Sequence, residues 1–383
     1  MRVLVIPTWY PNGEDKLMGI YHKEFTSALN KYGVDADMLF IARQRLKQPI
    51  KYMLMPKSQV FHEDNYTTYI HNILNLQPIN FDLQMKYYTK TLDKAFQKYI
   101  KDHPRPDVLH AQVTVPAGYA TVKLGEKYDI PVVVTEHGGL LERFFKDEPY
   151  KTYGLYVLSH STYTTVSHYM KEIALAYTNE CEILPNQVDT SIFKNDIIRK
   201  IDETFKLVMV CALREGKRLD IAFDALKMLK EENFAVHLDI VGDGFYETIF
   251  KEAARERGVE DMVTFHGRKE KKELPDYFEK AHALLITSEI ESFAIPGIEA
   301  MASGLPIIST DCLGPRDFVT EKTGILCRVN DPSSIKEAII KMKENYSDYS
   351  KKDLEEMADR FSEKNVVEMA KSIYKKAITT RLK

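Results

Sequence analysis

The chain has 383 residues, of which 44% are hydrophobic and 28% are charged, and its formal net charge is −3. This length exceeds one typical hydrophobic core and predicts two domains, in a chain with the composition of an ordinary soluble globular protein. The charge balance gives no reason to expect nucleic acid as a partner, and the four cysteines form no CxxC pair of the kind that holds zinc.

In the first half of the chain, short apolar runs alternate with amphipathic stretches. The segments Val3–Ile6, Asp107–His110 and Pro131–Thr135 are brief and rich in Val, Ile or Leu. Such runs predict buried parallel strands whose carboxyl ends lead into loops. The segment Tyr21–Lys31 has the apolar spacing of an amphipathic helix.

The second half repeats this alternation. A helix is predicted from Pro296, a favourable first-turn residue, to about Ser303, before Gly304 and Pro306. The predicted strands are Lys206–Val210, Val236–Val241, Ala283–Thr287 and Leu305–Ser309. The pattern predicts an α/β fold with two doubly wound, Rossmann-like parallel sheets and a ligand site in the cleft between the domains.

The predicted domain boundary lies in the segment LPNQVD, residues 184–189, where a strand-like run ends in Pro-Asn. We therefore expect an N-terminal domain over residues 1–186 and a C-terminal domain over residues 187–361. The last predicted helix, Asn365–Ile378, has one apolar side. Residues 362–383 are therefore expected to dock and to complete the N-terminal domain.

Two glutamates stand between apolar strands in the segment SEIESFAIPGIEAMASGLP, residues 288–306. Glu291 is expected in the loop after one strand, and Glu299 in the first turn of the following helix. The backbone amides of Phe293–Ile295 are expected to be unpaired donors at the positive end of the helix dipole. Carboxylates accept hydrogen bonds from sugar hydroxyls, and such amides bind phosphate oxygens. The same spacing also fits a solvated loop glutamate and a helix-capping glutamate.

The segment that contains these glutamates, residues 266–310, resembles the donor-binding core of the retaining glycosyltransferases of family 4, which have the GT-B fold. The glutamate spacing and the following EAMASGLP are typical of that family. The resemblance covers essentially the whole chain and includes TEHGG (135–139), LPNQVD (184–189), LREGKR (213–218), IVGDG (240–244) and FSEKNV (361–366). These motifs are specific as a group, although each is weak alone.

The resemblance implies roles for both glutamates. In the family the second glutamate, here Glu299, binds the ribose hydroxyls of the nucleotide. The first, here Glu291, contacts the transferred sugar together with backbone amides, which are those of Phe293, Ala294 and Ile295 in this chain.

The resemblance also implies a basic pair that binds the diphosphate, on the loop after the first strand of the C-terminal domain. Lys217 matches the lysine of this pair. The usual position of the arginine is Ala212 here, so Arg214 is the candidate. Gly242 is expected near the nucleobase, although Gly242 and Gly244 also fit a simple turn after a strand.

Two further positions of the family lie in the N-terminal domain. His137, in TEHGG, is expected beside the reacting sugar. The loop Pro11–Gly19 is expected to bring Gly19 close to the phosphates. His110 ends a predicted strand, and it fits either a structural role or a place facing the cleft.

These residues predict an enzyme that transfers a hexose or N-acetylhexosamine from a UDP- or GDP-linked donor to a glycan or lipid-linked acceptor, in surface polysaccharide or glycoconjugate biosynthesis. Retention is expected by front-face attack, as the resemblance implies. The motifs contain no DxD cluster for Mg²⁺, so we expect transfer without metal or cofactor. Ser292 and Gln187 stand where glycine is common in the family, which leaves local loop geometry open.

The region from Ile41 to Arg105 hints at the acceptor, because it holds eleven Lys and Arg against five Asp and Glu, an excess of +6. Lys86, Lys90, Lys94 and Lys98 recur at every fourth position beside an apolar helix face. They fit either a solvated helix edge or a surface that contacts anionic lipid headgroups. The chain has no apolar run long enough to span a membrane and no signal-peptide order at its start. We therefore expect a cytoplasmic protein, and peripheral contact with the inner face of the membrane stays open as the alternative to a solvated lysine edge.

Two other function classes remain open. A sugar-nucleotide epimerase of the same architecture would share the fold, but it is not expected to carry the spacing of Glu291 and Glu299 with EAMASGLP. A non-catalytic relative that only binds a nucleotide sugar would keep Glu299 without donor turnover.

Overall fold

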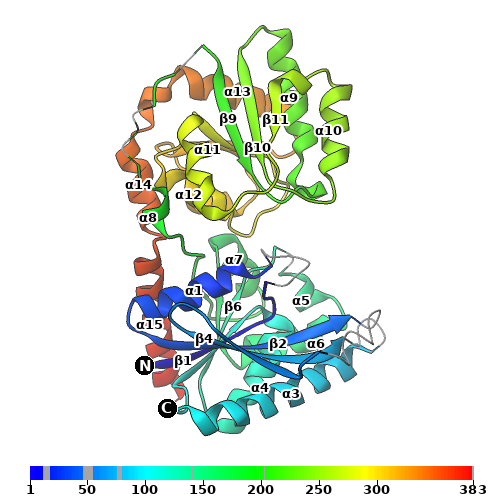
Figure 1. The fold of residues 1–383 in the computed structure, drawn as a ribbon, viewed down its shortest axis with the longest axis vertical. Coiled ribbons are helices and arrows are strands. Elements are labelled where there is room, and N and C mark those ends of the chain that lie inside the picture. The colour runs from blue at the N-terminus through cyan, green and yellow to red at the C-terminus, as the bar shows by residue number, and fades with distance from the viewer. Residues whose placement is uncertain are drawn as a thin grey trace. The chain divides into compact units, whose positions relative to one another are not determined.

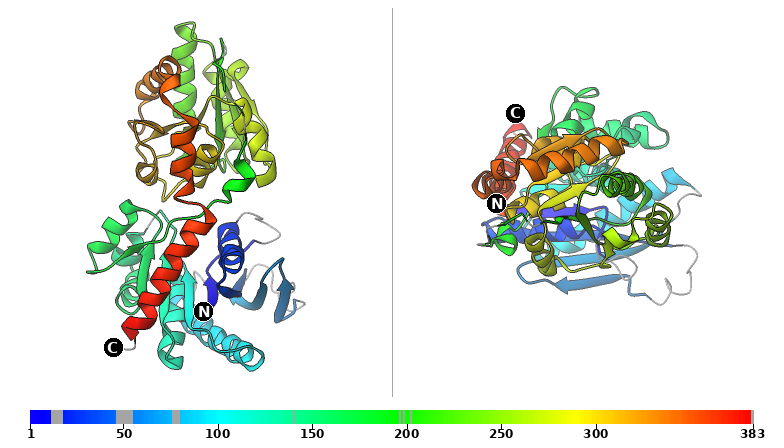
Figure 2. Two further views of the ribbon diagram at one scale, coloured as in Figure 1. Left: turned by 90° about the vertical axis from the view of Figure 1, so that its left-hand side faces the viewer. Right: turned by 90° about the horizontal axis from the view of Figure 1, so that it is seen from above.

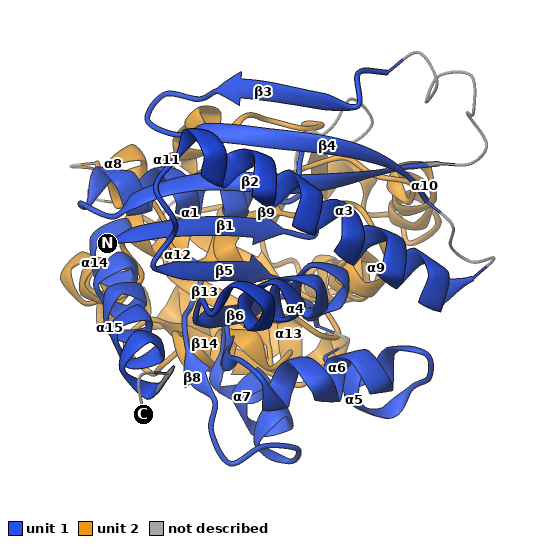
Figure 3. Ribbon diagram, turned by 90° about the horizontal axis from the view of Figure 1, so that it is seen from below, with its two compact units in different colours: residues 1–186, 363–383 blue, residues 187–362 orange. Residues whose placement is uncertain are grey.

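The computed structural model describes residues 1–11, 18–45, 55–75, 80–139, 141–195, 197, 199–201 and 203–381. The chain divides into two compact units (Figure 1). Unit 1 consists of Met1–Asn186 together with Glu363–Lys383, and unit 2 of Gln187–Ser362 (Figure 3). No helix in the described part of the chain combines the length and the apolar composition needed to cross a bilayer.

Unit 1 is built on an eight-stranded sheet within the described residues, in the order β3-β4-β2-β1-β5-β6-β7-β8. Neighbouring strands pair in parallel, except that β3 is antiparallel to β4. The strands are β1 (Arg2–Pro7), β2 (Asp35–Arg45), β3 (Ser58–His62), β4 (Thr67–Asn75), β5 (Val108–Gln112), β6 (Val132–Glu136), β7 (Thr162–Thr165) and β8 (Glu182–Ile183). The three strands predicted in this half are confirmed as β1, β5 and β6.

Helices cover both faces of this sheet because its central strands are apolar on both sides. On one face, Val3 and Val5 of β1 share a buried cluster with α1 (Ile20–Lys31) and with α15 (Glu363–Arg381). Figure 2 shows α15 running along this unit at the end of the chain. The other face is covered by α3 (Phe81–Asp102) and α4 (Tyr119–Tyr128), which pack against each other. The remaining helices of the unit are α5 (Arg143–Lys146), α6 (Tyr150–Ser159) and α7 (His168–Leu175).

Unit 2 repeats the plan with a six-stranded sheet, all parallel among the described residues, in the order β11-β10-β9-β12-β13-β14. Its strands are β9 (Phe205–Val210), β10 (Val236–Val241), β11 (Val263–Phe265), β12 (Ala283–Ile286), β13 (Ile307–Thr310) and β14 (Gly324–Cys327). Its helices are α8 (Thr190–Phe193), α9 (Leu219–Glu231), α10 (Glu247–Glu256), α11 (Leu274–Lys280), α12 (Ile295–Ala302), α13 (Pro332–Glu344) and α14 (Lys351–Asp359). The four strands predicted in this half are confirmed as β9, β10, β12 and β13.

One expectation about α12 is wrong. The helix begins at Ile295, one residue before Pro296, and no acidic residue lies in its first turn. Glu299 is therefore the fifth helical residue and not part of the first turn. The early start follows from Ala294, which precedes the helix in a left-handed conformation with φ of 73°.

The strand order changes direction at one strand in each sheet. Strand β1 has β2 on one side and β5 on the other, and β9 has β10 on one side and β12 on the other. In doubly wound sheets, loops that leave such a point diverge to opposite faces and open a binding site beyond the carboxyl ends of the strands. The loops after β9 and β12 are placed in this way in unit 2, and those after β1 and β5 in unit 1.

Candidate functional site

In unit 2, a lysine and a glutamate meet at the carboxyl ends of β9 and β12. Lys217 lies in a short 3-10 turn, Glu215–Lys217, that follows β9. Glu291 lies in the loop between β12 and α12. Because β9 and β12 pair directly, the two loops are neighbours, and Lys217 Nζ lies 2.5 Å from Glu291 Oε1. The structure thus brings together two residues that are 74 positions apart.

Hydroxyl groups hold this ion pair in place. Ser288 Oγ donates to Glu291 Oε1 at 2.6 Å, so the carboxylate receives a second hydrogen bond beside that of Lys217. Thr287 Oγ1 donates to the carbonyl oxygen of Lys217 at 2.8 Å. The backbone N–H of Glu291 donates to the carbonyl oxygen of Cys312 at 2.8 Å. The loops after β9, β12 and β13 therefore form one hydrogen-bonded edge.

The ion pair fixes the charge of Lys217. Burial alone would lower the pKa of Lys217, but the negative charge of Glu291 and the hydrogen bond between the two outweigh it and raise the pKa above its usual value. The Lys217 side chain is 27% exposed and that of Glu291 is 15% exposed. The ammonium is therefore charged at neutral pH and is within reach of an anion from solvent.

The start of α12 offers backbone donors close to this pair. No partner for the N–H groups of Phe293, Ala294 and Ile295 is found among the described residues. The Phe293 side chain is buried against Phe318 and Phe361, with ring centroids 5.9 and 5.3 Å away. Packing of this ring anchors the turn and leaves the backbone, not the side chain, of Phe293 for contact with a ligand.

Glu299 is almost fully buried on α12, with 5% of its surface exposed. Its Oε1 lies 3.5 Å from Nζ of Lys271, a residue of the turn Lys271–Glu273 before α11. Lys271 is a site residue that the sequence did not single out, because it stands in the charged run RKEKKE.

Arg214 and Gly242 belong to the same edge of unit 2 and have different roles there. Arg214 is exposed, and within the described residues its side chain has no hydrogen bond or ion pair. Gly242 follows β10 with φ of 147°, and a Cβ there would lie 1.8 Å from the carbonyl oxygen of Cys211. Its lack of a side chain allows the loop after β10 to support the loop that carries Lys217.

In unit 1, His137 lies directly after β6 and contacts two amide side chains. Its Nε2 lies 2.6 Å from Gln112 Oε1, at the end of β5, and its Nδ1 lies 3.0 Å from Asn186 Oδ1. Burial lowers the pKa of His137 to about 3, although the contact with Asn186 acts in the opposite direction. The imidazole is therefore neutral at pH 7, and a base of such low pKa is a poor proton acceptor there.

The loop that carries His137 is held by a buried carboxylate, Glu136. Its Oε1 accepts hydrogen bonds from the N–H groups of His137 and Gly138 at 2.9 and 2.7 Å. Its Oε2 accepts from the N–H and the hydroxyl of Thr114 at 2.8 and 2.6 Å. Burial raises the pKa of Glu136, and these hydrogen bonds offset part of that effect. The residue positions the backbone after β6.

His110 does not face a cleft. Strand β5 continues to Gln112, so His110 lies inside it and is fully buried. Its Nδ1 lies 2.6 Å from the hydroxyl of Tyr374 on α15, and its Nε2 lies 2.7 Å from Thr135 Oγ1. Of its two interpretations, the structural one is confirmed.

Gly19 precedes α1 with φ of 71°, and a Cβ there would lie 2.5 Å from the carbonyl oxygen of Trp9. This contact explains why glycine is needed where the first loop returns to β1. Most of the predicted loop Pro11–Gly19, residues 12–17, lies outside the described residues.

Five contact residues of these sites were not singled out in the sequence. Gln112, Asn186 and Ser288 are uncharged polar residues near strand ends, and Glu136 and Lys271 are charged residues among many. Membership of a motif is the signal that could have found four of them, because Asn186 lies in LPNQVD, Glu136 in TEHGG, and Ser288 and Lys271 within residues 266–310. Gln112 lies two residues beyond a predicted strand.

Comparison with known proteins decides the family. The model "Glycosyl transferases group 1" matches residues 192–365, and the model "Glycosyltransferase Family 4" matches residues 53–192. The chain belongs to glycosyltransferase family 4. This confirms the resemblance inferred from the motifs around Glu291 and Glu299.

Proteins similar to this family 4 glycosyltransferase are found in archaea and bacteria. An uncharacterized glycosyltransferase, MJ1178 of Methanocaldococcus jannaschii, is 28% identical over 269 residues, which cover 67% of this chain and 71% of the relative. The putative teichuronic acid biosynthesis glycosyltransferase TuaC of Bacillus subtilis is 24% identical over 361 residues, which cover 88% of each chain.

Solved structures show that the fold of this family 4 glycosyltransferase is GT-B. Sucrose-phosphate synthase of Thermosynechococcus elongatus matches with a TM-score of 0.74 and 16% identity, over 99% of this chain and 100% of that structure. HepE of Anabaena, in complex with UDP and glucose, matches with a TM-score of 0.71 and 15% identity, over 97% and 98%.

Proposed function

We propose that this glycosyltransferase moves a hexose or N-acetylhexosamine from a UDP- or GDP-linked donor to a glycan or lipid-linked acceptor, with retention and without a metal ion, in surface polysaccharide or glycoconjugate assembly. The observation that carries the proposal is Lys217. It presents a charged ammonium at the carboxyl edge of unit 2, in contact with Glu291, which lies two residues before Phe293. The N–H groups of residues 293–295 have no partner among the described residues. An ammonium beside backbone donors at a helix start is suited to a diphosphate.

We assign the other donor contacts as follows. Glu299 accepts hydrogen bonds from the ribose hydroxyls, and Gly242 lies near the nucleobase. Glu291 contacts the transferred sugar, and Gly19 approaches the phosphates. His137 lies beside the reacting sugar as a neutral group, which its lowered pKa supports, and a hydrogen bond from its ring to the sugar would replace one with Gln112 or Asn186.

The proposed chemistry follows from these groups. The bond between the anomeric carbon and the β-phosphate oxygen breaks, and the acceptor oxygen forms a new bond to that carbon on the same face. The acceptor proton passes to the leaving phosphate, so no enzyme carboxylate has to act as nucleophile. Lys217, Arg214 and the start of α12 stabilise the negative charge that develops on the phosphate, the kind of electrostatic stabilisation that is usually largest in enzymes.

A donor screen followed by a transfer assay tests the proposal. UDP- and GDP-sugars are first ranked by thermal shift, because a bound donor raises the melting temperature. Nucleoside diphosphate release is then measured with and without acceptor, and the anomeric configuration of the product is read by NMR. Acceptor-dependent release with retained configuration, unchanged by EDTA, supports the proposal. Inversion contradicts retention, and loss of activity in EDTA that Mg²⁺ restores contradicts metal independence. An isomerised donor without transfer indicates the epimerase, and binding without turnover indicates the non-catalytic relative.

A further inference from the structure

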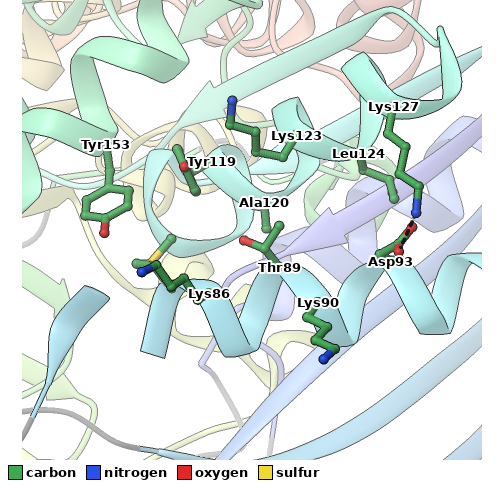
Figure 4. Close-up of a pocket in the computed structure, with 11 residues that line it drawn as sticks. Lys86, Thr89, Lys90, Asp93, Tyr119, Ala120, Lys123, Leu124, Lys127 and Tyr153 are labelled. Carbon is green, nitrogen blue, oxygen red and sulfur yellow. Dashed lines mark hydrogen bonds and ion pairs between the residues drawn. The ribbon is translucent and has the colours of Figure 1, made fainter. Parts of the chain in front are cut away.

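A groove of about 490 Å³ runs between α3 and α4, on the face of unit 1 opposite to α1 and α15. Each helix contributes two lysines to its lining. Figure 4 shows Lys86 and Lys90 on α3, and Lys123 and Lys127 on α4. The apolar side chains of Met85 and Leu124 also line the groove. It therefore combines an apolar surface with cationic edges.

The charges in the groove are not balanced. Four ammonium groups line it against the carboxylate of Asp93. Glu126, which pairs with Lys123, and Asp82, which accepts a hydrogen bond from Tyr153 of the lining, reduce the local net charge to +1. Asp93 pairs with Lys127 at 2.7 Å, as the dashed line in Figure 4 shows. Lys123 pairs with Glu126 at 3.1 Å. Lys86 and Lys90 are exposed, and neither forms an ion pair with any other described residue.

The structure divides the row of four lysines that the sequence presents. A spacing of four residues turns roughly 40° beyond a full helical turn at each step, so the row winds around α3. Lys86 and Lys90 line the groove, whereas Lys94 and Lys98 do not. Burial lowers the pKa of His71 on β4, and the charge of Lys98 adds to this effect, so Lys98 acts on the neighbouring strand instead.

Exposed apolar side chains stand beside the groove lysines. Leu83 and Tyr87 on α3 are 52% and 37% exposed. Residues 83, 86, 87 and 90 follow the spacing i, i+3, i+4 and i+7 and therefore share one face of the helix. The buried residues of α3, such as Tyr88 and Leu92, are on its other side. A solvent-facing surface of this kind offers apolar side chains to an acyl boundary and cationic side chains to lipid phosphates.

We infer that the groove between α3 and α4 binds phosphate headgroups of anionic lipids and docks unit 1 on a membrane surface. A free phosphate ion is a poorer fit, because the four lysines are spread along two helices and the exposed side chain of Leu83 would stay in water. A lipid surface offers phosphates to the lysines and an acyl boundary to the apolar stripe. The inference does not depend on the proposed transfer reaction.

Vesicle flotation tests the inference on the full chain. The vesicles are phosphatidylcholine alone or equimolar phosphatidylcholine and phosphatidylglycerol. Binding is expected only to the anionic vesicles. A lysine near an anionic surface contributes about fivefold to partitioning, so the double variant Lys86→Gln/Lys90→Gln should bind roughly 25-fold more weakly. Leu83→Ser should also weaken binding, by roughly threefold to fivefold, because it removes an apolar contact with the lipid.

The matched control is Lys227→Gln/Lys230→Gln, which removes two charges from exposed positions on α9 of unit 2. Neither lysine belongs to unit 1, so this variant should bind nearly as well as the wild type. If both double variants lose the same amount of vesicle binding, the effect is one of diffuse charge, and the assignment of the lipid site to the groove is overturned. An absence of binding to anionic vesicles would overturn membrane docking. Displacement by inorganic phosphate, but not by chloride at the same ionic strength, would identify a free-anion site instead. Nucleoside diphosphate release with a water-soluble acceptor should be the same in Lys86→Gln/Lys90→Gln and the wild type. A failure of membrane docking is therefore distinguishable from a failure of the proposed function.

Discussion

Replacing each member of the Lys217–Glu291 pair should change nucleotide binding in opposite directions. Lys217→Met removes the ammonium but keeps a long side chain. Glu291→Gln removes the charge but keeps an oxygen that can accept from Ser288 Oγ, which donates to Glu291 Oε1 at 2.6 Å in the structure. In the free protein the ammonium is engaged by Glu291 at 2.5 Å. A diphosphate must therefore share Lys217 with this carboxylate or displace it.

The size of each effect follows from the geometry of the pair. A charge-assisted hydrogen bond from Lys217 to phosphate contributes about 1.5–3 kcal/mol, so Lys217→Met should weaken UDP or GDP binding roughly 10- to 150-fold. With side chains 27% and 15% exposed, solvent screens the attraction between Lys217 and Glu291 to about 1 kcal/mol net. Glu291→Gln frees the ammonium and should strengthen binding by roughly fivefold. The double variant should bind like Lys217→Met, because Glu291 affects the diphosphate through Lys217.

Isothermal titration calorimetry with UDP and GDP measures these affinities. The matched control is Lys230→Met, since Lys230 lies in the same unit and pairs with Asp261 at 2.7 Å on the exposed side of α9. Its affinity should equal that of the wild type. If Lys217→Met also binds like the wild type, the loop after β9 is not the phosphate site. If Glu291→Gln weakens binding as much as Lys217→Met, the carboxylate is needed to position the lysine and does not compete with the ligand.

Three further predictions concern single positions. Glu299→Ala should weaken UDP binding by about 1.5–3 kcal/mol but weaken 2′-deoxy-UDP binding less, in competition titrations; equal losses would place the ribose elsewhere. Gly242→Ala should destabilise unit 2 by about 3 kcal/mol or more, because the new Cβ would lie 1.8 Å from the carbonyl oxygen of Cys211. The control Gly216→Ala should not destabilise it, because a Cβ there would meet nothing within 4 Å. Equal urea midpoints for the two variants would contradict this. Burial lowers the pKa of His110 to about 3, below its unfolded value near 6.5, so protonation of this residue favours the unfolded state. The protein therefore has its full stability above pH 6.5 and loses stability as the pH falls. Unfolding in urea at pH 5 should show a loss of roughly 2 kcal/mol from this residue, which His110→Gln should remove; an unchanged pH dependence would refute it.

The fold was predictable from the sequence because its central strands are buried on both faces. Continuous apolar runs such as VLVI in β1 can be recognised as strands without knowing which strand they pair with. The ends of elements were less predictable, because they depend on single backbone conformations. Ala294 in a left-handed conformation moves the start of α12 forward, and two more residues in β5 place His110 inside the sheet. No periodic pattern reports either feature.

The placement of Lys217, Glu291 and His137 in loops after strands was predictable, because each stands in a motif next to a predicted strand. The site was not predictable where the role depends on contact across the sheet. Gln112 becomes a partner of His137 only because β5 and β6 pair with Gln112 opposite Thr135. The same limit applies to α3, where the four-residue spacing of lysines predicts a cationic edge but not which two lysines face α4.

The two units place polar groups by the same device, the carboxyl ends of adjacent parallel strands, but with opposite electrostatics. In unit 2 the edge carries Lys217, whose pKa is raised and whose charge persists at any physiological pH. In unit 1 the edge carries His137, whose pKa is lowered to about 3 and which contacts only uncharged amides through its ring nitrogens. The proposed roles follow this difference. A persistent positive charge is what a diphosphate requires, and Lys217 supplies it. The imidazole of His137, held by Gln112 and Asn186, adds no charge to the edge of unit 1.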